Sequence, residues 1–427
     1  MNYFKQIYYE MKHQRMMTWV SIGGTALAIF LVMAFIMADR INTVEVAPES
    51  NRARILQATG LHIIEEKNEG STWGLNYKLL DRLYGNLDGI EMVCYQYAFD
   101  EPSDVNVKNG EILSMPSKKV DANYWNIYDF SFIDGRPFDE AEAASSKVVV
   151  LSRSLARALF GEEKVAGREI EVNAYSYRVI GVVEDVNPLL RSTNSKLYIP
   201  YNPAGKNERD EYFGSSMMTL LMKPGVSAES VKAQVEKRYE MLQSDLSKDN
   251  KRVVYHGQPY TTEEVGEGGY GSNNGPDIEQ SRLLDYIVYG IIILLPAINL
   301  SSMTRSRLRH RVSEIGVRRA FGAKRSAIIR QILGENLIIT MVGGLIGMVV
   351  SIIFMYLMFD VFFNSGSIFG ASSLEEAQAR PDMGMLMTWQ NFTVAFIICF
   401  ILNLLSAFVP AWKASKVEPA VAISRAH

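Results

Sequence analysis

The sequence contains very little cysteine. Only Cys94 and Cys399 occur among its 427 residues. Cys399 lies inside a long apolar run, whereas Cys94 lies far outside it. A disulfide between the two is therefore not expected, and the region around Cys94 must fold on an apolar core alone. We interpret Cys94 as a buried thiol and not as a reactive one.

Recognisable catalytic motifs are also missing. The sequence has no GxxxxGK[ST] phosphate loop, no GxSxG and no HExxH, and its five histidines lack the spacing of metal ligands. A GxGxxG run occurs at Gly266, Gly268 and Gly271, but Ser-Asn-Asn-Gly-Pro follows it, where a dinucleotide site needs the start of a helix. We interpret this run as a flexible linker. The sequence therefore predicts a chain that is not an enzyme and that has no catalytic site, cofactor or metal of its own.

Long apolar stretches, in contrast, are prominent. Four of them carry no charged side chain: Met17–Met37, Tyr286–Met303, Leu337–Phe359 and Phe392–Trp412. Helices of about 20 residues cross the hydrocarbon core of a membrane, so we predict four transmembrane α-helices, at 17–38, 286–303, 337–359 and 392–412. A cleavable signal peptide is the alternative for the first stretch, but the apolar run is longer than such peptides need.

Lysine and arginine are concentrated in three of the segments that flank these stretches. The N-terminus (1–16), the loop 304–336 and the tail 413–427 together hold 15 basic and 4 acidic residues, whereas Asp360–Gln390 holds one arginine and four acidic residues. Basic flanks stay on the cytoplasmic side of a membrane. We therefore predict a multi-pass protein of the cytoplasmic (inner) membrane with both termini in the cytoplasm, and with 39–285 and the short loop 360–391 outside.

The segment 39–285 is long enough to form a large domain with its own core. Outside the three basic segments the chain has 29 basic and 43 acidic residues, which argues against nucleic acid as a partner of this domain. Its apolar patterns alternate between strand and helix periods, which predicts an α+β domain, of two subdomains by size, without repeats. We predict strands at Ile55–Glu65, Ile90–Phe99, Val148–Leu151, Glu169–Val172, Tyr177–Glu184 and Met217–Lys223, and helices near Asn76–Tyr84, at Ser154–Phe160 and at Ala228–Asp245.

Two connections to the membrane have their own patterns. Asp39–Arg54 is predicted to continue the first membrane helix as a helical stalk. The glycine-rich stretch Gly257–Pro276 is predicted to be a polar loop before the chain returns to the membrane.

The loop 304–336 is the most basic part of the chain, with nine arginine and lysine residues. Within it, Val317, Ala320 and Phe321 have the i, i+3, i+4 spacing of a small apolar face on a short helix, which Gly322 could end in a left-handed conformation. Ser326 is predicted to cap the next helix, whose Ile328, Ile329, Ile332 and Leu333 would lie along the membrane. The short helix that carries Val317 and Phe321 suits the groove of a partner protein; a topology anchor without a partner is the alternative.

Two further patterns lie inside the predicted membrane helices. Pro296 and Asn299 could form a bend that transmits motion or a kink that is satisfied by packing. Gly343 and Gly347 have GxxxG spacing, which allows close approach of another helix, either within one subunit or at a dimer interface.

A long motif in the basic loop resembles the signature of FtsX/MacB-type ABC transporter permeases. It reads EIGVRRAFGAKRSAIIRQILGEN and is followed by an apolar segment with Gly343, Gly344 and Gly347. Three further segments are similar to that family in the same order: Tyr124–Phe138, Val148–Asp185 and Pro410–Ile423. The resemblance spans nearly the whole chain and implies a MacB-like domain between the first two membrane helices.

The resemblance also implies what the basic loop does. In this family it carries a coupling helix that docks on a cytosolic ABC ATPase, and the matching residues are Glu314, Ile315, Gly316, Arg318, Arg319, Ala320, Gly322 and Ala323. A second permease subunit, identical or different, and two ATPase subunits that bind ATP and Mg are further implied. Because about 17 residues precede the first apolar stretch, we expect the ATPase on a separate chain.

These observations favour a permease subunit that transmits ATP-driven motion to its outer domain, for export or efflux of a peptide, drug or lipid-linked substrate. A periplasmic adaptor and membrane lipids are then expected as further partners. The alternatives are an FtsX-like relay that activates a cell-wall hydrolase, and lipoprotein release.

Overall fold

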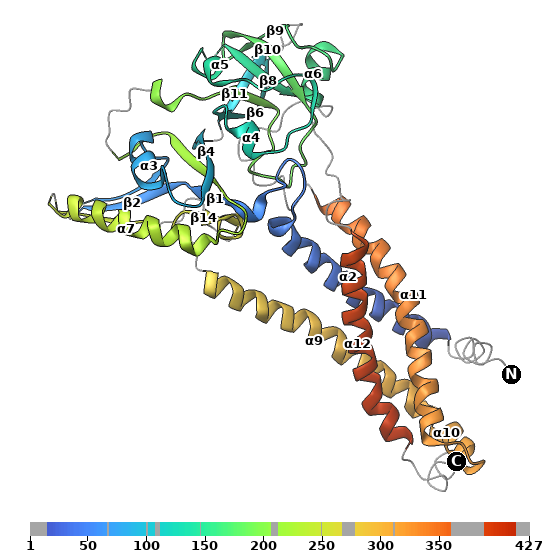
Figure 1. The fold of residues 1–427 in the computed structure, drawn as a ribbon. Coiled ribbons are helices and arrows are strands. Elements are labelled where there is room, and N and C mark those ends of the chain that lie inside the picture. Colours follow the sequence, from blue (N-terminus) through green and yellow to red (C-terminus); the bar gives the residue numbers. More distant parts are fainter. Residues whose placement is uncertain are drawn as a thin grey trace. The chain divides into compact units, whose positions relative to one another are not determined.

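The structure is a computed structural model in which residues 15–65, 68–99, 101–106, 112–145, 147–205, 212–248, 250–266, 278–310, 312–359 and 388–415 are described. The chain divides into two compact units. One holds the described strands and is here named the head unit; the other holds the long helices and is named the helical unit (Figure 1). The N-terminal 14 residues, the short loop 360–387 and the tail from 416, together with Gly268 and Gly271 of the GxGxxG run, lie outside the described residues.

One half of the head unit is built from two interlocked β-α-β units. Their strands follow the order β14-β1-β12-β4, all antiparallel, which is the ferredoxin-like arrangement. The elements, in chain order, are β1 (Ile55–Ala58), α3 (Tyr77–Tyr84), β4 (Ile90–Tyr97), β12 (Ser216–Met222), α7 (Ala228–Ser247) and β14 (Tyr260–Thr261).

The two helices of this half bury apolar stripes against the sheet. On α7 the predicted face of Val231, Val235, Tyr239 and Leu242 is buried, which confirms the helical period read from the sequence. Helix α3 begins where predicted, because the Asn76 side chain caps it by accepting the Lys78 N–H at 2.9 Å.

The predicted strand Ile55–Glu65 is wrong as a single element. It breaks at Thr59 into β1 and β2 (Gly60–Glu65), and β2 joins a separate sheet with β3 (Asn68–Trp73) and β13 (Lys251–Val254). The Thr59 N–H donates to Gln258 Oε1 at 2.8 Å instead of to a neighbouring strand. A side chain almost 200 residues away thus ends the strand, which no local pattern indicates.

The other half of the head unit is inserted between β4 and β12 and contains a closed barrel. The order β11-β8-β10-β9-β5-β6 closes on itself because β11 also pairs with β6. The strands are β5 (Pro102–Asn106), β6 (Ile112–Val120), β8 (Val148–Ser152), β9 (Glu169–Val172), β10 (Tyr175–Val183) and β11 (Leu197–Pro200). The predicted strands that correspond to β9 and β10 are confirmed and pair antiparallel, whereas β5, β6 and β11 were not predicted.

The barrel is filled by alternate side chains of its strands. Val149 and Leu151 of β8 face the interior core together with Leu155 of α6 (Arg153–Phe160). Val148 and Val150 face the opposite side, where they meet α4 (Tyr124–Ile127). Near these outer residues lie the smaller elements β7 (Phe132–Gly135) and α5 (Glu140–Ser145). Strand β8 therefore contributes side chains to two cores.

Cys94 of β4 is a buried, free thiol, as predicted. Burial raises its pKa well above the usual range of a thiol, because the thiolate would lose its hydration. The side chain of Cys94 therefore behaves as a small apolar core residue.

Two predicted connections differ from the structure. Helix α2 (Arg15–Thr43) ends at Thr43, so the helical stalk Asp39–Arg54 is wrong beyond that residue. The loop Gly257–Pro276 is also wrong in part, because its first residues form β14 and the short helix α8 (Thr262–Glu264). In both cases short-range hydrogen bonds of side chains to backbone fold a polar stretch: Glu45 Oε1 accepts the Ala53 N–H, and Thr261 and Glu264 cap α8 reciprocally.

The helical unit contains α2, α9 (Ile278–His310), α10 (Val312–Ala320), α11 (Arg325–Phe359) and α12 (Trp389–Ser415). The four charge-free stretches all lie inside α2, α9, α11 and α12. Within the described residues, Arg15–Met37 and Arg325–Phe354 are long and apolar enough to cross a membrane, and Trp389–Leu405 is a shorter apolar helix. The number of crossings therefore stays a prediction.

Helix α11 packs between α2 and α12. Gly343 and Gly347 lie against α2, where an added Cβ would approach Thr25 Cβ to 2.8 Å and the Ala26 carbonyl oxygen to 2.6 Å. On its other side, the Asn403 amide of α12 donates to Thr340 Oγ1 of α11. The GxxxG glycines thus contact a helix of the same chain.

Helix α9 remains helical on both sides of Pro296 and Asn299, whose side chains are outside the described part of the structure. The Tyr289 ring of α9 meets the Phe35 ring of α2 edge to face, with centroids 4.0 Å apart.

Candidate functional site

The predicted coupling segment forms a helix, a tight turn and the start of a second helix. Helix α10 ends at Ala320 because Gly322 takes a left-handed conformation with φ +88°. The Ala323 N–H donates to the Arg318 carbonyl at 3.1 Å, and the Gly322 N–H donates to the Arg319 carbonyl at 3.0 Å. These two bonds form a Schellman motif, so the predicted role of Gly322 as a helix terminator is confirmed.

One face of this segment is buried. Ile315 of α10 packs with Ile328 and Ile332 of α11 and with Ala411 of α12, and Ala323 of the turn adds to this cluster. The prediction that Ile328 and Ile332 lie along the membrane is therefore wrong. They are covered by α10 and α12 because the turn folds the two helices together.

The predicted cap of the second helix is also wrong. Helix α11 begins at Arg325, so Ser326 already lies inside its first turn. The Lys324 carbonyl accepts the Ala327 N–H at 3.0 Å and so begins the helix. The helix therefore starts one residue before Ser326, shortly after the Schellman turn.

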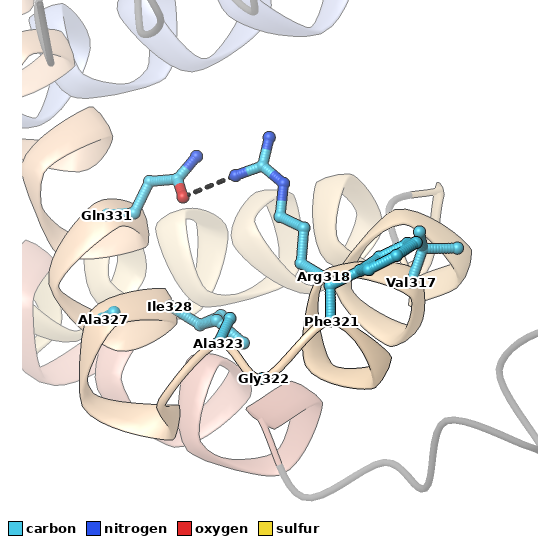
Figure 2. A pocket seen from close by; sticks show the side chains of 8 residues that line it. All are labelled: Val317, Arg318, Phe321, Gly322, Ala323, Ala327, Ile328 and Gln331. Carbon is cyan, nitrogen blue, oxygen red and sulfur yellow. Dashed lines mark hydrogen bonds between the residues drawn. The ribbon is translucent and has the colours of Figure 1, made fainter. Parts of the chain in front are cut away.

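The opposite face is apolar and exposed. The side chain of Phe321 is 89% exposed, and Val317 is 42% exposed. Ala320 is exposed as well, which confirms the apolar face predicted from the i, i+3, i+4 spacing. Figure 2 shows the Phe321 ring extending toward Val317 at the end of α10. A ring so exposed on a defined turn is suited to enter a pocket of another molecule.

An open groove of about 400 Å³ lies beside this ring. It is lined by Val317, Arg318, Phe321, Gly322, Ala323, Ala327, Ile328 and Gln331 (Figure 2). Its lining comes from both helices and the turn, so its shape depends on the angle at which α10 meets α11.

Polar side chains hold that angle. The Arg318 guanidinium donates from Nη1 to Gln331 Oε1 at 2.8 Å, across from α10 to α11 (Figure 2). The Gln331 amide in turn donates to Glu335 Oε1 at 3.4 Å, and the Glu335 side chain is buried. Bonds to a charged partner are stronger than neutral ones, so this chain stiffens the junction.

The rim of the groove is basic. Lys324 and Arg325 are exposed at the start of α11, and Arg318 and Arg319 are half-buried on α10. Of Glu314 the structure describes only the backbone, which is helical, and Gly316 is buried. Gln331 and Ala327 line the groove but were not predicted from the sequence as site residues.

Two family models match the chain. The model of the MacB-like periplasmic core domain matches residues 18–238, and the model of the FtsX-like permease C-terminal region matches residues 286–419. The chain belongs to the FtsX/MacB-type permease family. The second match includes the whole coupling segment, from α10 through the Gly322 turn to α11.

Relatives of this permease agree with the assignment. It is 24% identical to the uncharacterized ABC transporter permease YknZ of Bacillus subtilis, over 71% of this chain and 68% of YknZ. It is 26% identical to the macrolide export ATP-binding/permease protein MacB of Burkholderia cenocepacia, over 72% of this chain and 40% of MacB. The match thus spans two fifths of that relative. A domain of a Porphyromonas gingivalis putative permease aligns with TM-score 0.38 at 15% identity, over 48% of this chain and 88% of that one.

The family assignment indicates which unit is periplasmic and which contains the candidate membrane helices. The permease is a membrane-embedded protein with a periplasmic core domain, and it carries apolar helices of the length and composition that membranes require. The head unit accordingly corresponds to the periplasmic domain, and the long helices are candidates for the membrane spans.

Replacing Gly322 tests the turn by itself. We expect Gly322→Ala to destabilise the helical unit by roughly 1 kcal/mol, because a side chain at this positive φ is strained and shifts the end of α10. Steric overlap does not contribute, since an added Cβ would meet nothing within 4 Å. Gly322→Asn, which tolerates left-handed φ better, is the matched control, and thermal denaturation of the purified permease is the measurement. Equal melting temperatures for both variants and wild type would show that the left-handed turn does not form.

Proposed function

We propose that this chain is the permease subunit of an ABC transporter complex and that a cytosolic ATPase on a separate chain docks on α10. The observation that carries the proposal is the exposed Phe321 ring beside a groove with a basic rim. The ring would enter an apolar pocket of the ATPase, and Arg319, Lys324 and Arg325 would face its carboxylates. Motion driven by ATP would then pass through the helices to the periplasmic head unit.

The proposal includes a topology with four crossings, made by α2, α9, α11 and α12. Both termini and α10 would be cytoplasmic, because the basic residues of the chain are concentrated in these segments. The docking site and the head unit would thus lie on opposite sides of the membrane.

The ATPase would supply the catalysis. ATP and Mg would bind to that partner, since this sequence contains no phosphate-binding loop. A second permease subunit would complete the complex. We propose export or efflux of a peptide, drug or lipid-linked molecule as its work, and the MacB relative, which is named for macrolide export, supports this class.

Affinity purification of the full chain from its native membranes tests the proposal. We expect an ABC ATPase to co-purify in amounts comparable to the permease, together with an adaptor or duct protein if the work is efflux. Recovery of a cell-wall hydrolase instead would favour a regulatory relay, and recovery of a lipoprotein carrier would favour lipoprotein release. A preparation without any ATPase would contradict the proposed function.

A further inference from the structure

The chain that follows α2 is tied into a compact turn at the start of the head unit. Arg52 donates from Nη1 to the Val44 carbonyl at 3.3 Å, and the Ala53 N–H donates to Glu45 Oε1 at 3.1 Å. These bonds join the beginning of the segment 44–54 to its end. A displacement of α2 would therefore move the whole segment 44–54, which directly precedes β1.

At the centre of this turn lies a buried ion pair. Arg52 Nε is 2.9 Å from Glu49 Oε2, and the exposed fractions of the two side chains are 7% and 1%. Burying two charges is costly unless further hydrogen bonds satisfy them. One such bond comes from the barrel half of the head unit: Thr193 Oγ1 donates to Glu49 Oε1 at 2.9 Å, and Thr193 is fully buried.

Thr193 is firmly attached to the barrel. Its carbonyl accepts the Tyr198 hydroxyl of β11 at 2.7 Å, and its hydroxyl also lies 3.5 Å from the Leu190 carbonyl. A second tie to the barrel half runs from the Asp129 N–H to the Pro48 carbonyl, at 2.9 Å. The turn after α2 is thus bound to the barrel half at two points.

The same turn meets the chain that leads back to the membrane. Thr262 Oγ1, at the start of α8, donates to the Arg52 carbonyl at 3.2 Å, and β14 pairs with β1 directly beside it. The segment that enters from α2 and the segment that leads toward α9 therefore share Arg52 as a common contact.

We propose that Glu49, Arg52 and Thr193 form an entry joint that passes the motion of α2 to the barrel and to the chain leading to α9 together. Glu49 is the positioning residue, because its carboxylate holds the arginine of the turn and the threonine of the barrel at once. This inference rests on the proposed function, since the motion to be passed on is the one driven by the ATPase.

Hydrogen exchange of the full-length permease in lipid nanodiscs, co-purified with its ATPase, tests the joint. Thr193→Val removes the hydroxyl with little change in volume or charge, and Thr193→Ser keeps the hydroxyl as the matched control. Without nucleotide, we expect exchange in residues 44–54 to rise about tenfold in Thr193→Val and to stay unchanged in Thr193→Ser. Unchanged protection of β8 and β10 will show that the barrel of the variant is folded.

Trapping with Mg, ATP and vanadate separates a transmitting joint from a merely structural tie. In wild type and in Thr193→Ser we expect nucleotide to change exchange in both residues 44–54 and the barrel. In Thr193→Val we expect the change in 44–54 to remain and the change in the barrel to be strongly reduced, because only the bond between Asp129 and Pro48 is left, while ATP turnover is kept. Glu49→Gln, which keeps an acceptor for Thr193 but loses the ion pair, should reduce the change in the barrel only in part.

Two results would overturn the inference, for different reasons. If Thr193→Val keeps the wild-type change in the barrel, the joint is wrong and the proposed function stands. If the wild-type complex turns over ATP without any nucleotide-dependent change in the head unit, the proposed transmission fails, and the joint fails with it.

Discussion

Phe321→Ala should lower the affinity of the permease for its ATPase by about 30-fold or more while the protein still inserts into the membrane. Truncation of an aromatic side chain that fills a partner's pocket weakens binding by roughly 2–4 kcal/mol. Each 1.4 kcal/mol raises the dissociation constant about tenfold. Phe321 is 89% exposed, so its removal opens no cavity and should not unfold the helical unit. Stimulation of ATP turnover by the permease should fall with the affinity.

The measurement is co-purification of the ATPase with each variant, followed by ATP turnover of the reconstituted complex. Met241→Ala, on the head unit, is the matched control, because Met241 is also an exposed apolar side chain at 66% exposure. Arg318→Glu should uncouple as well, because it reverses the rim charge and removes the bond to Gln331. If Phe321→Ala and Arg318→Glu still bind the ATPase and show wild-type turnover, the coupling site has been assigned wrongly.

Gly347→Leu should prevent α2 and α11 from packing and so destabilise the helical unit by about 3 kcal/mol. An added Cβ would lie 2.6 Å from the Ala26 carbonyl oxygen and 3.1 Å from Ile29 Cβ. The contact at 2.6 Å involves a backbone atom, which cannot change its rotamer to make room as a flexible side chain can. The helices would have to separate, and the contacts of Gly343 and Gly344 along the same seam would be lost with them.

Thermal denaturation of the detergent-solubilised permease and its yield from membranes measure this effect. Gly23→Leu is a sharp control, since Gly23 lies in α2 and an added Cβ there meets nothing within 4 Å. It has the same change of volume in the same kind of helix. Equal melting temperatures for the two variants would show that α2 and α11 do not pack closely at Gly347.

Local patterns predicted the parts of the fold whose contacts are close in sequence. The period of Val231, Val235 and Tyr239 predicts the buried face of α7, and Gly322 predicts the end of α10. The spacing of Val317 and Phe321 likewise predicts an exposed apolar face in the candidate site. Each of these depends on a residue and neighbours within about one or two helical turns.

Patterns failed where distant residues decide the outcome. Gln258 ends β1 by bonding Thr59, and no feature near Thr59 indicates this. Ile328 and Ile332 have the apolarity of membrane-facing residues, yet Ile315 and Ala411 cover them. The bond from Arg318 to Gln331 was missed because both residues read as ordinary polar positions of separate helices.

The sequence by itself determined which segments are apolar helices, which loop is basic, and where an exposed aromatic ring stands in that loop, because composition and helical period are properties of short windows. Only the tertiary structure decided that strands far apart in sequence close the barrel through β6 and β11, and that Glu49 meets Thr193. These pairings depend on loop closure over tens to more than a hundred residues, whose cost is met by many weak contacts at once. No single window of the sequence contains them.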